Sequence, residues 1–146
     1  MNSRFAVAVH ILTVLEQGRG EPVTSEVIAG SVNTNPSLVR RLLGLLAKAG
    51  LATSRMGTGG GALLARPASE ITLRDVYRAV DEEGEVFAMH RERPSPACPV
   101  GRNIQAVLER RFDDAARALE AELDRTTIAD LGREIAERSG PEARPS

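Results

Sequence analysis

Apolar residues recur at helical spacing in the first third of the chain. In residues 3–17 they fall at Val7, Ile11, Val14 and Leu15, which predicts an amphipathic helix. Asn35 is a residue type that begins helices, and Pro36 after it favours the first helical position. We therefore predict three helices in this part, over residues 3–17, 25–31 and 36–49, the second begun by Thr24 and the third ended by Gly50.

The helical spacing of apolar residues ends at Gly50. Residues 51–55 and 62–66 have the length and composition of two short strands, and the glycine-rich loop 56–61 between them predicts a hairpin. Thr72, placed three residues before Asp75, is typical of a capping box at the start of a further helix over 73–80.

A long apolar stripe marks the second half of the chain. Residues 81–102 contain three prolines and predict an irregular linker, after which a helix is predicted over 102–123. One face of this helix carries a stripe of apolar residues that is too large for a helix surrounded by solvent, so we expect the stripe to contact a second copy of the chain. The alternative is that the helix packs back onto its own domain. The candidate interface comprises Ile104, Leu108, Phe112, Ala115, Leu119 and Leu123.

These elements predict a mainly α fold with a small β-hairpin. Residues 1–80 form a winged helix-turn-helix domain, residues 81–102 the linker and residues 103–138 the dimerisation helices, the last of them begun by Thr127. The tail 139–146 is expected to be disordered.

Composition narrows the class of protein. Apolar residues make up 42% of the 146 residues and aromatic residues only 3%, which predicts an aliphatic core. The first helix resembles a signal peptide, but it contains Glu16 and no small-residue cleavage site follows it, so we expect a cytoplasmic protein. A single cysteine, Cys98, excludes a disulfide within the chain and a four-cysteine metal site.

Charge is distributed unevenly although the net charge is only −1. Residues 1–80 contain 9 basic and 5 acidic residues, whereas residues 81–146 contain 10 and 15. Within 24–66 there are five basic residues and one acid, Glu26. This asymmetry favours an anionic partner for the first half, and double-stranded DNA is the partner we expect.

The helix predicted over 36–49 has two distinct faces. Leu38, Leu42, Leu45, Leu46 and Ala49 share one side, which we expect to be buried. The opposite side is basic and small, as a helix entering the DNA major groove requires; it comprises Ser37, Arg40, Arg41, Gly44 and Lys48. Gly44 costs a helix about 1 kcal/mol relative to Ala. Close approach to DNA and close helix packing are the two explanations.

The glycine-rich loop allows two interpretations. Residues 57–62 fit the dinucleotide pattern G-x-G-x-x-A, with Asp81 about 20 residues on, but no strand–helix–strand unit surrounds them. A wing flanked by Arg55 and Arg66, whose backbone amides meet phosphates, is favoured over the nucleotide site, and a purely structural hairpin is the larger alternative. The candidate DNA-binding residues are Thr24, Asn35, Pro36, Ser37, Arg40, Arg41, Lys48, Arg55, Thr58, Gly59 and Gly60.

Other reactive residues are few. Cys98 precedes the long helix, where a thiol pKa can be lowered, and is a candidate redox sensor; an unreactive thiol is the alternative. His90 and Cys98 are too few to bind a metal, and His10 is expected to be structural. No catalytic constellation is recognisable, so neither enzymatic activity nor a cofactor is expected.

Several segments together resemble the Rrf-two family of bacterial winged-helix regulators, in its YwnA-like, cluster-free branch. They are residues 36–43, 49–51, 57–61, 64–67, 71–76 and 98–104. The resemblance covers residues 1–138 and implies a dimer crossed through the long helix that recognises a dyad operator with the third helix and the wing. It places Ser37, Arg40 and Arg41 on the recognition helix.

The same resemblance sets limits. Cluster-binding members use three cysteines before the long helix, where this chain has only Cys98, so iron is not expected. The family's wing arginine is Met56 here, and Arg55 is a candidate substitute. We expect a homodimeric, sequence-specific transcription regulator, most simply a repressor, of unknown effector; the alternative is a winged-helix protein–protein interaction module.

Overall fold

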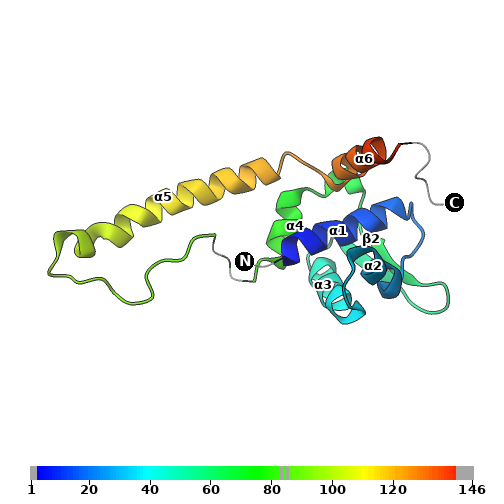
Figure 1. Ribbon diagram of the computed structural model, residues 1–146, viewed down its shortest axis with the longest axis horizontal. Coiled ribbons are helices and arrows are strands. Elements are labelled where there is room, and N and C mark those ends of the chain that lie inside the picture. Colours follow the sequence, from blue (N-terminus) through cyan, green and yellow to red (C-terminus); the bar gives the residue numbers. More distant parts are fainter. Residues whose placement is uncertain (1–2, 83, 85, 141–146) are drawn as a thin grey trace.

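The computed structural model describes residues 3–82, 84 and 86–140, so part of the predicted disordered tail, 141–146, lies outside the described residues. Five helices and a hairpin form a compact body from which one long helix extends (Figure 1). In chain order the elements are α1 (Arg4–Gln17), α2 (Ser25–Val32), α3 (Pro36–Lys48), β1 (Ala52–Arg55), β2 (Gly61–Leu64), the 3-10 turn η1 (Ala68–Glu70), α4 (Leu73–Val80), α5 (Pro99–Leu123) and α6 (Ile128–Ser139).

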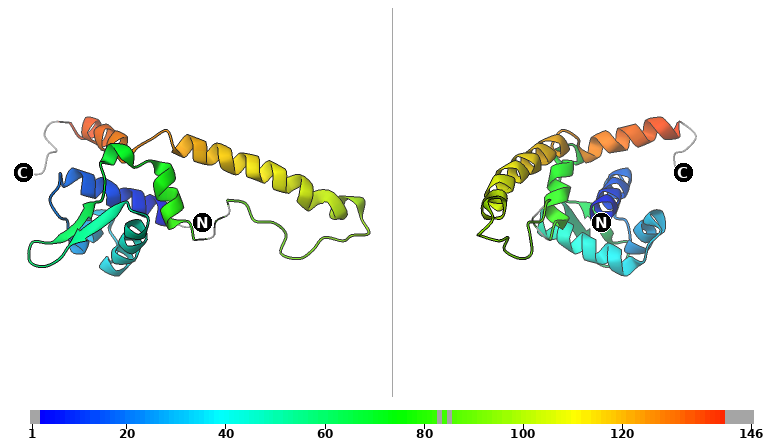
Figure 2. Two further views of the ribbon diagram at one scale, coloured as in Figure 1. Left: turned by 180° about the vertical axis from the view of Figure 1, so that it is seen from behind. Right: turned by 60° about the vertical axis from the view of Figure 1, so that its left-hand side comes forward.

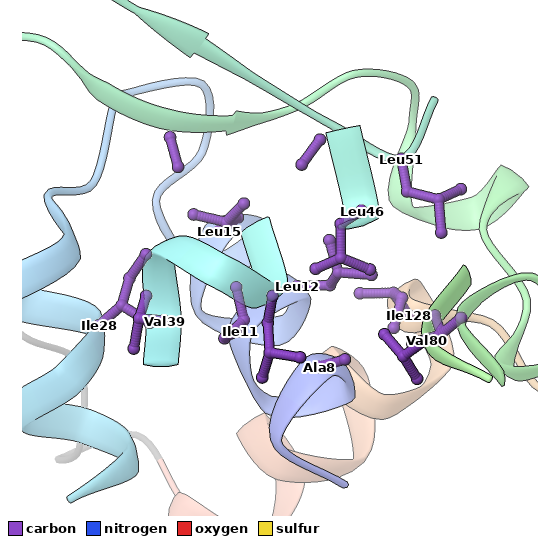
Figure 3. Close-up of a cluster of buried hydrophobic side chains, with 14 of the residues drawn as sticks. Ala8, Ile11, Leu12, Leu15, Ile28, Val39, Leu46, Leu51, Val80 and Ile128 are labelled. Atoms are coloured by element: carbon purple, nitrogen blue, oxygen red, sulfur yellow. The ribbon is translucent and has the colours of Figure 1, made fainter. Parts of the chain in front are cut away.

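The core lies around α1, which contacts α2, α3, α4 and α6. Its buried side chains are aliphatic, as the low aromatic content predicted, and ten of them are labelled in Figure 3. Ile11 and Leu12 of α1, Leu46 of α3 and Ile128 of α6 are fully buried there. One aliphatic cluster thus joins the two ends of the described chain.

The predicted helix boundaries are reproduced to within a few residues. Asn35 Oδ1 accepts a hydrogen bond from the backbone N–H of Leu38 at 2.9 Å and caps α3, whose first residue is Pro36. Gly50 has φ 78°, a left-handed conformation that favours glycine, and ends the helix as expected.

The hairpin is antiparallel, with Ala52 paired to Leu64 and Arg55 to Gly61. It is attached to the body through Val23, which exchanges two backbone hydrogen bonds with Ala62, of 3.0 and 2.7 Å. This pairing fixes the direction in which the wing leaves the domain.

The final helix, which the sequence grouped with the dimerisation helices, packs onto the body. Ile128 is fully buried, and its backbone N–H donates to the carbonyl of Ile71 at 2.9 Å. Gly132 of α6 lies against the Glu16 side chain of α1, where a Cβ would come within 2.5 Å of a carboxylate oxygen. The winged-helix body is therefore completed by residues that follow α5, and Ser139, predicted to be in the tail, ends α6.

α5 extends away from the body as an arm of 25 residues (Figure 2). It begins three residues earlier than predicted because Pro99 occupies its first turn, where a proline is compatible with a helix. None of its residues, all of them described, is buried. Among the described residues, neither α5 nor any other helix combines the length and hydrophobicity that crossing a membrane requires.

Candidate nucleic-acid interface

The outward face of α3 is exposed as predicted: Ser37, Arg40, Arg41, Gly44 and Lys48 all face solvent. The buried face is rotated slightly from the predicted one. It is centred on Val39, Leu42 and Leu46, while Leu38 and Leu45 are half-buried and Ala49 is exposed. Val39 was missed because the helical spacing alone does not show where α1 and α2 meet α3.

Gly44 lies in the middle of this exposed face. A Cβ placed there would find no heavy atom within 4 Å. Close packing within the chain therefore does not explain the glycine, which leaves approach by an external partner as the remaining explanation of the two.

Two acidic residues lie near the arginines of α3. Arg40 is 4.0 Å from Glu26 of α2, and its Nη2 is 3.5 Å from Ser37 Oγ. Arg41 Nη2 lies 3.4 Å from Oε1 of Glu82, just after α4. Both arginine side chains stay more than half exposed, so these surface pairs hold them only weakly.

Glu82 also pairs with Arg4 of α1 at 2.5 Å. The hydrogen bond and charge of Arg4, with a smaller contribution from Arg41, hold the pKa of the Glu82 carboxyl below its usual value. Glu82 is thus a permanent anion at neutral pH that competes with any anionic partner for Arg41. Nothing in the sequence pattern pointed to this residue.

The cap residues lie beside the basic face. Thr24 Oγ1 accepts a hydrogen bond from the backbone N–H of Val27 at 3.2 Å, and both Thr24 and Asn35 are exposed. Pro36 is half-buried at the start of α3. Thr24, Asn35 and Pro36 therefore lie at the N-termini of α2 and α3, where anions are favoured.

The wing is a tight, glycine-dependent loop. Gly57 and Gly59 have φ of 89° and 77°, and a Cβ on Gly60 would lie 2.1 Å from the carbonyl oxygen of Arg55. Thr58 and Arg55 are exposed, and no ion pair to Arg55 occurs among the described residues. Because a strand, β2, follows the loop where a dinucleotide site needs a helix, the nucleotide interpretation fails.

Met56 is 88% exposed at the same wing. A large apolar side chain so fully in solvent contributes nothing to the fold, which makes it available to a partner. Arg55 next to it supplies the nearest positive charge in the loop.

The apolar stripe of α5 divides between two faces. Phe112 stacks on Phe87 of the linker, with ring centroids 4.8 Å apart, so part of the stripe contacts its own chain. Leu119 is 38% exposed, and two residues outside the predicted stripe, Val100 and Val107, are 67% and 56% exposed. Ile104, Leu108 and Leu123 are half-buried, whereas Ala115 is exposed.

Cys98 is exposed at the N-cap of α5. The backbone N–H groups of Gly101 and Val100 lower the pKa of its thiol. His90 is exposed, while His10 contacts Ser31 Oγ at 2.8 Å and so joins α1 to α2, consistent with the structural role expected of it. Among the described residues no three His, Cys, Asp or Glu side chains are grouped to hold a metal ion.

This is a winged helix-turn-helix protein of the transcription-regulator type. The class is defined by two helices, a tight turn, an exposed basic helix and a wing. Residues 1–134 match the family model Rrf2 (Rrf-two), described as "Iron-dependent Transcriptional regulator". The chain belongs to this family. Its members are regulators rather than enzymes, which confirms the predicted class and the expected lack of enzymatic activity.

Similar proteins agree with this assignment. A Bacillus subtilis protein, "Putative HTH-type transcriptional regulator YwnA", is 48% identical over 131 residues, covering 90% of this chain and 96% of its own. Protein rrf2 of Nitratidesulfovibrio vulgaris is 31% identical over 85% of this chain and 80% of its own. A crystal structure described as "a putative DNA binding protein" is 42% identical, with a TM-score of 0.71 over 88% of this chain and 98% of its own.

The iron in the family description does not fit the residues of this chain. The whole sequence contains one cysteine, and the described residues bring no ligand set around it. Iron therefore has no role in the function proposed below.

Proposed function

We propose that this protein is a homodimeric, sequence-specific DNA-binding repressor that recognises a dyad operator. The observation that supports this most strongly is the outward face of α3, which is basic, exposed and free of side-chain bulk at Gly44. A helix with such a face fits the major groove, which is about 12 Å wide. Repression follows most simply if an occupied operator excludes other proteins from the same DNA.

The interface extends beyond α3. The N-termini of α2 and α3, begun by Thr24 and Asn35, offer backbone N–H groups to phosphates. The wing adds Arg55, the backbone amides of Thr58 and Gly59, and close approach at Gly60, whose own N–H donates to the carbonyl of Gly57 at 3.0 Å. Arg40, Arg41 and Lys48 then supply the base and phosphate contacts of the recognition helix.

α5 supplies the dimer contact in this proposal. A helix of 25 residues spans about 37 Å at 1.5 Å per residue. Its two most exposed apolar residues, Val100 and Val107, are seven residues apart and so share one face. They need a partner of the same chemistry, and a second copy of α5 is the economical one. Two recognition helices related by a two-fold axis would then match half-sites about 34 Å apart.

The decisive experiment measures DNA affinity by fluorescence anisotropy on an operator selected from random-sequence DNA. Arg40→Ala with Arg41→Ala is expected to abolish specific binding, and wild-type affinity is expected to fall steeply with salt. Arg133→Ala with Arg138→Ala removes the same charge from α6 and should leave binding intact. If no sequence is selected and affinity ignores salt, the interaction-module alternative replaces this proposal.

Dimerisation is tested with a matched pair on α5. Val107→Asp places a carboxylate on the exposed apolar face and is expected to yield monomers, because an unpaired buried charge is costly. Ala106→Asp makes the same change on the neighbouring residue, which points about 100° away, and should leave the dimer intact. Light scattering that finds wild-type monomers at high concentration contradicts the dimer.

A further inference from the structure

A cavity of about 440 Å³ lies between α4, the linker after it and the middle of α5. The linker leaves α4 and runs out toward the far end of α5 before the helix returns to the body (Figure 1). A volume of this size is within the range of small-molecule sites. The cavity has no role in the proposed DNA contact.

Aromatic side chains are concentrated at this cavity. The chain has four aromatic residues in all, and three of them, Tyr77, Phe87 and Phe112, line it. The fourth, Phe5, packs edge-on against Tyr77 with ring centroids 5.5 Å apart. The core is otherwise aliphatic, so the few aromatic rings of this protein are gathered around one cavity.

The charged residues that line the cavity are acidic. Asp81, Glu109, Asp113 and Glu120 line it, and none of the basic residues in the described part of the chain does. Glu120 is neutralised by Arg78, at 2.5 Å, and by Arg74, at 3.3 Å. Asp113 and Glu109 take part in no ion pair among the described residues, although Arg110 and Arg117 lie beside them on the neighbouring surface of α5.

The pKa of Tyr77 reports the same environment. It is raised first by burial and then by the negative charges of Asp81 and Glu120, which disfavour a phenolate. An anionic ligand would meet the same repulsion, whereas a cation would be attracted both by the carboxylates and by the ring faces.

We propose that this cavity is a binding site for an organic cation with an apolar or aromatic body, such as a quaternary ammonium compound. The rings of Phe87, Phe112 and Tyr77 contact the body of the ligand and its positive charge, and Glu109 and Asp113 provide the counter-charge. The pocket face of α5, centred on residues 109 and 113, points well over 90° away from Val100 and Val107, so dimerisation through these two residues leaves the cavity accessible.

The site is tested by calorimetric titration of the full chain with benzyltrimethylammonium, in the absence of DNA. Saturable binding is expected, with benzenesulfonate and benzyl alcohol, which carry a negative and no charge, binding at least about fivefold more weakly. Tyr77 is the only tyrosine and the chain has no tryptophan, so its fluorescence gives a second readout at the site itself.

Variants separate this site from nonspecific attraction. Glu109→Gln with Asp113→Asn should weaken the cation about fivefold or more, and Phe87→Ala should weaken it through loss of a stacked ring. Glu122→Gln with Glu137→Gln changes the net charge equally outside the cavity and should have no effect. Absence of saturable binding, equal affinity for benzenesulfonate, or equal effects of the two double variants would overturn the proposal. None of these results depends on whether the protein binds DNA.

Discussion

Replacing Gly44 with Ala should have opposite effects on stability and on DNA binding. A glycine in the middle of an exposed helix costs about 1 kcal/mol relative to Ala, because it has more backbone freedom to lose on folding. A methyl group at Gly44 would meet no heavy atom within 4 Å, so no clash offsets the gain. The variant should therefore unfold about 3 °C higher than the wild type.

DNA affinity should fall in the same variant. The methyl group would stand between Arg41 and Lys48 on the face proposed to enter the major groove, and it would hold the backbone of α3 away from the bases. Loss of one base contact corresponds to about 1–3 kcal/mol, or roughly 5- to 150-fold in affinity. Thermal unfolding followed by circular dichroism and anisotropy titration on the selected operator measure the two effects separately.

Gly30 of α2 provides the matched control. It too is an exposed helical glycine, and a Cβ added to it would have nothing within 4 Å. Gly30→Ala should raise stability while leaving DNA affinity unchanged. If Gly44→Ala is stabilised and still binds as tightly as Gly30→Ala, then α3 does not approach DNA at residue 44, and close approach to DNA is refuted as the reason for the glycine.

Three further predictions concern single side chains. Glu82→Gln should raise operator affinity, because Arg41 loses its intramolecular competitor; unchanged affinity in anisotropy titrations would show that the contact does not compete with DNA. Glu120→Gln should lower the melting temperature at pH 7, because it removes the ion pair with Arg78 that holds the pKa of Glu120 below its ordinary value of 4.5. The stabilisation by this ion pair is full above pH 4.5 and is lost as the pH falls through the lowered pKa. The difference between the two proteins should vanish in acid, and a difference that persists at low pH would assign the effect to packing. Cys98 should react with iodoacetamide at lower pH than a free cysteine, since backbone N–H groups favour its thiolate. If treatment with diamide leaves the operator affinities of the wild type and Cys98→Ser equal, redox control through Cys98 is excluded. Protein purified with bound iron would contradict the argument that one cysteine is too few to hold iron.

Local signals in the sequence determined most of the secondary structure. Asn35 and Pro36 begin α3 and Gly50 ends it because cap geometry depends on residues a few positions apart. The outward face of α3 was also predictable, since a helix has a fixed period and charged side chains are rarely buried. The same holds for the wing, whose positive φ angles favour glycine.

Contacts between distant segments could not be obtained in this way. The burial of Ile128 places α6 in the winged-helix body, although α5 separates it in sequence from that body. Phe112 stacks on Phe87 of the linker, and Glu82 reaches Arg41 across 41 residues. Periodicity predicts that a helix has an apolar face, but which surface covers that face depends on how the chain returns in space. The sequence thus determined the elements and the class of this protein, whereas the tertiary structure decided which side chains remain available on α3 and α5, because burial and ion pairing arise only when separate elements meet.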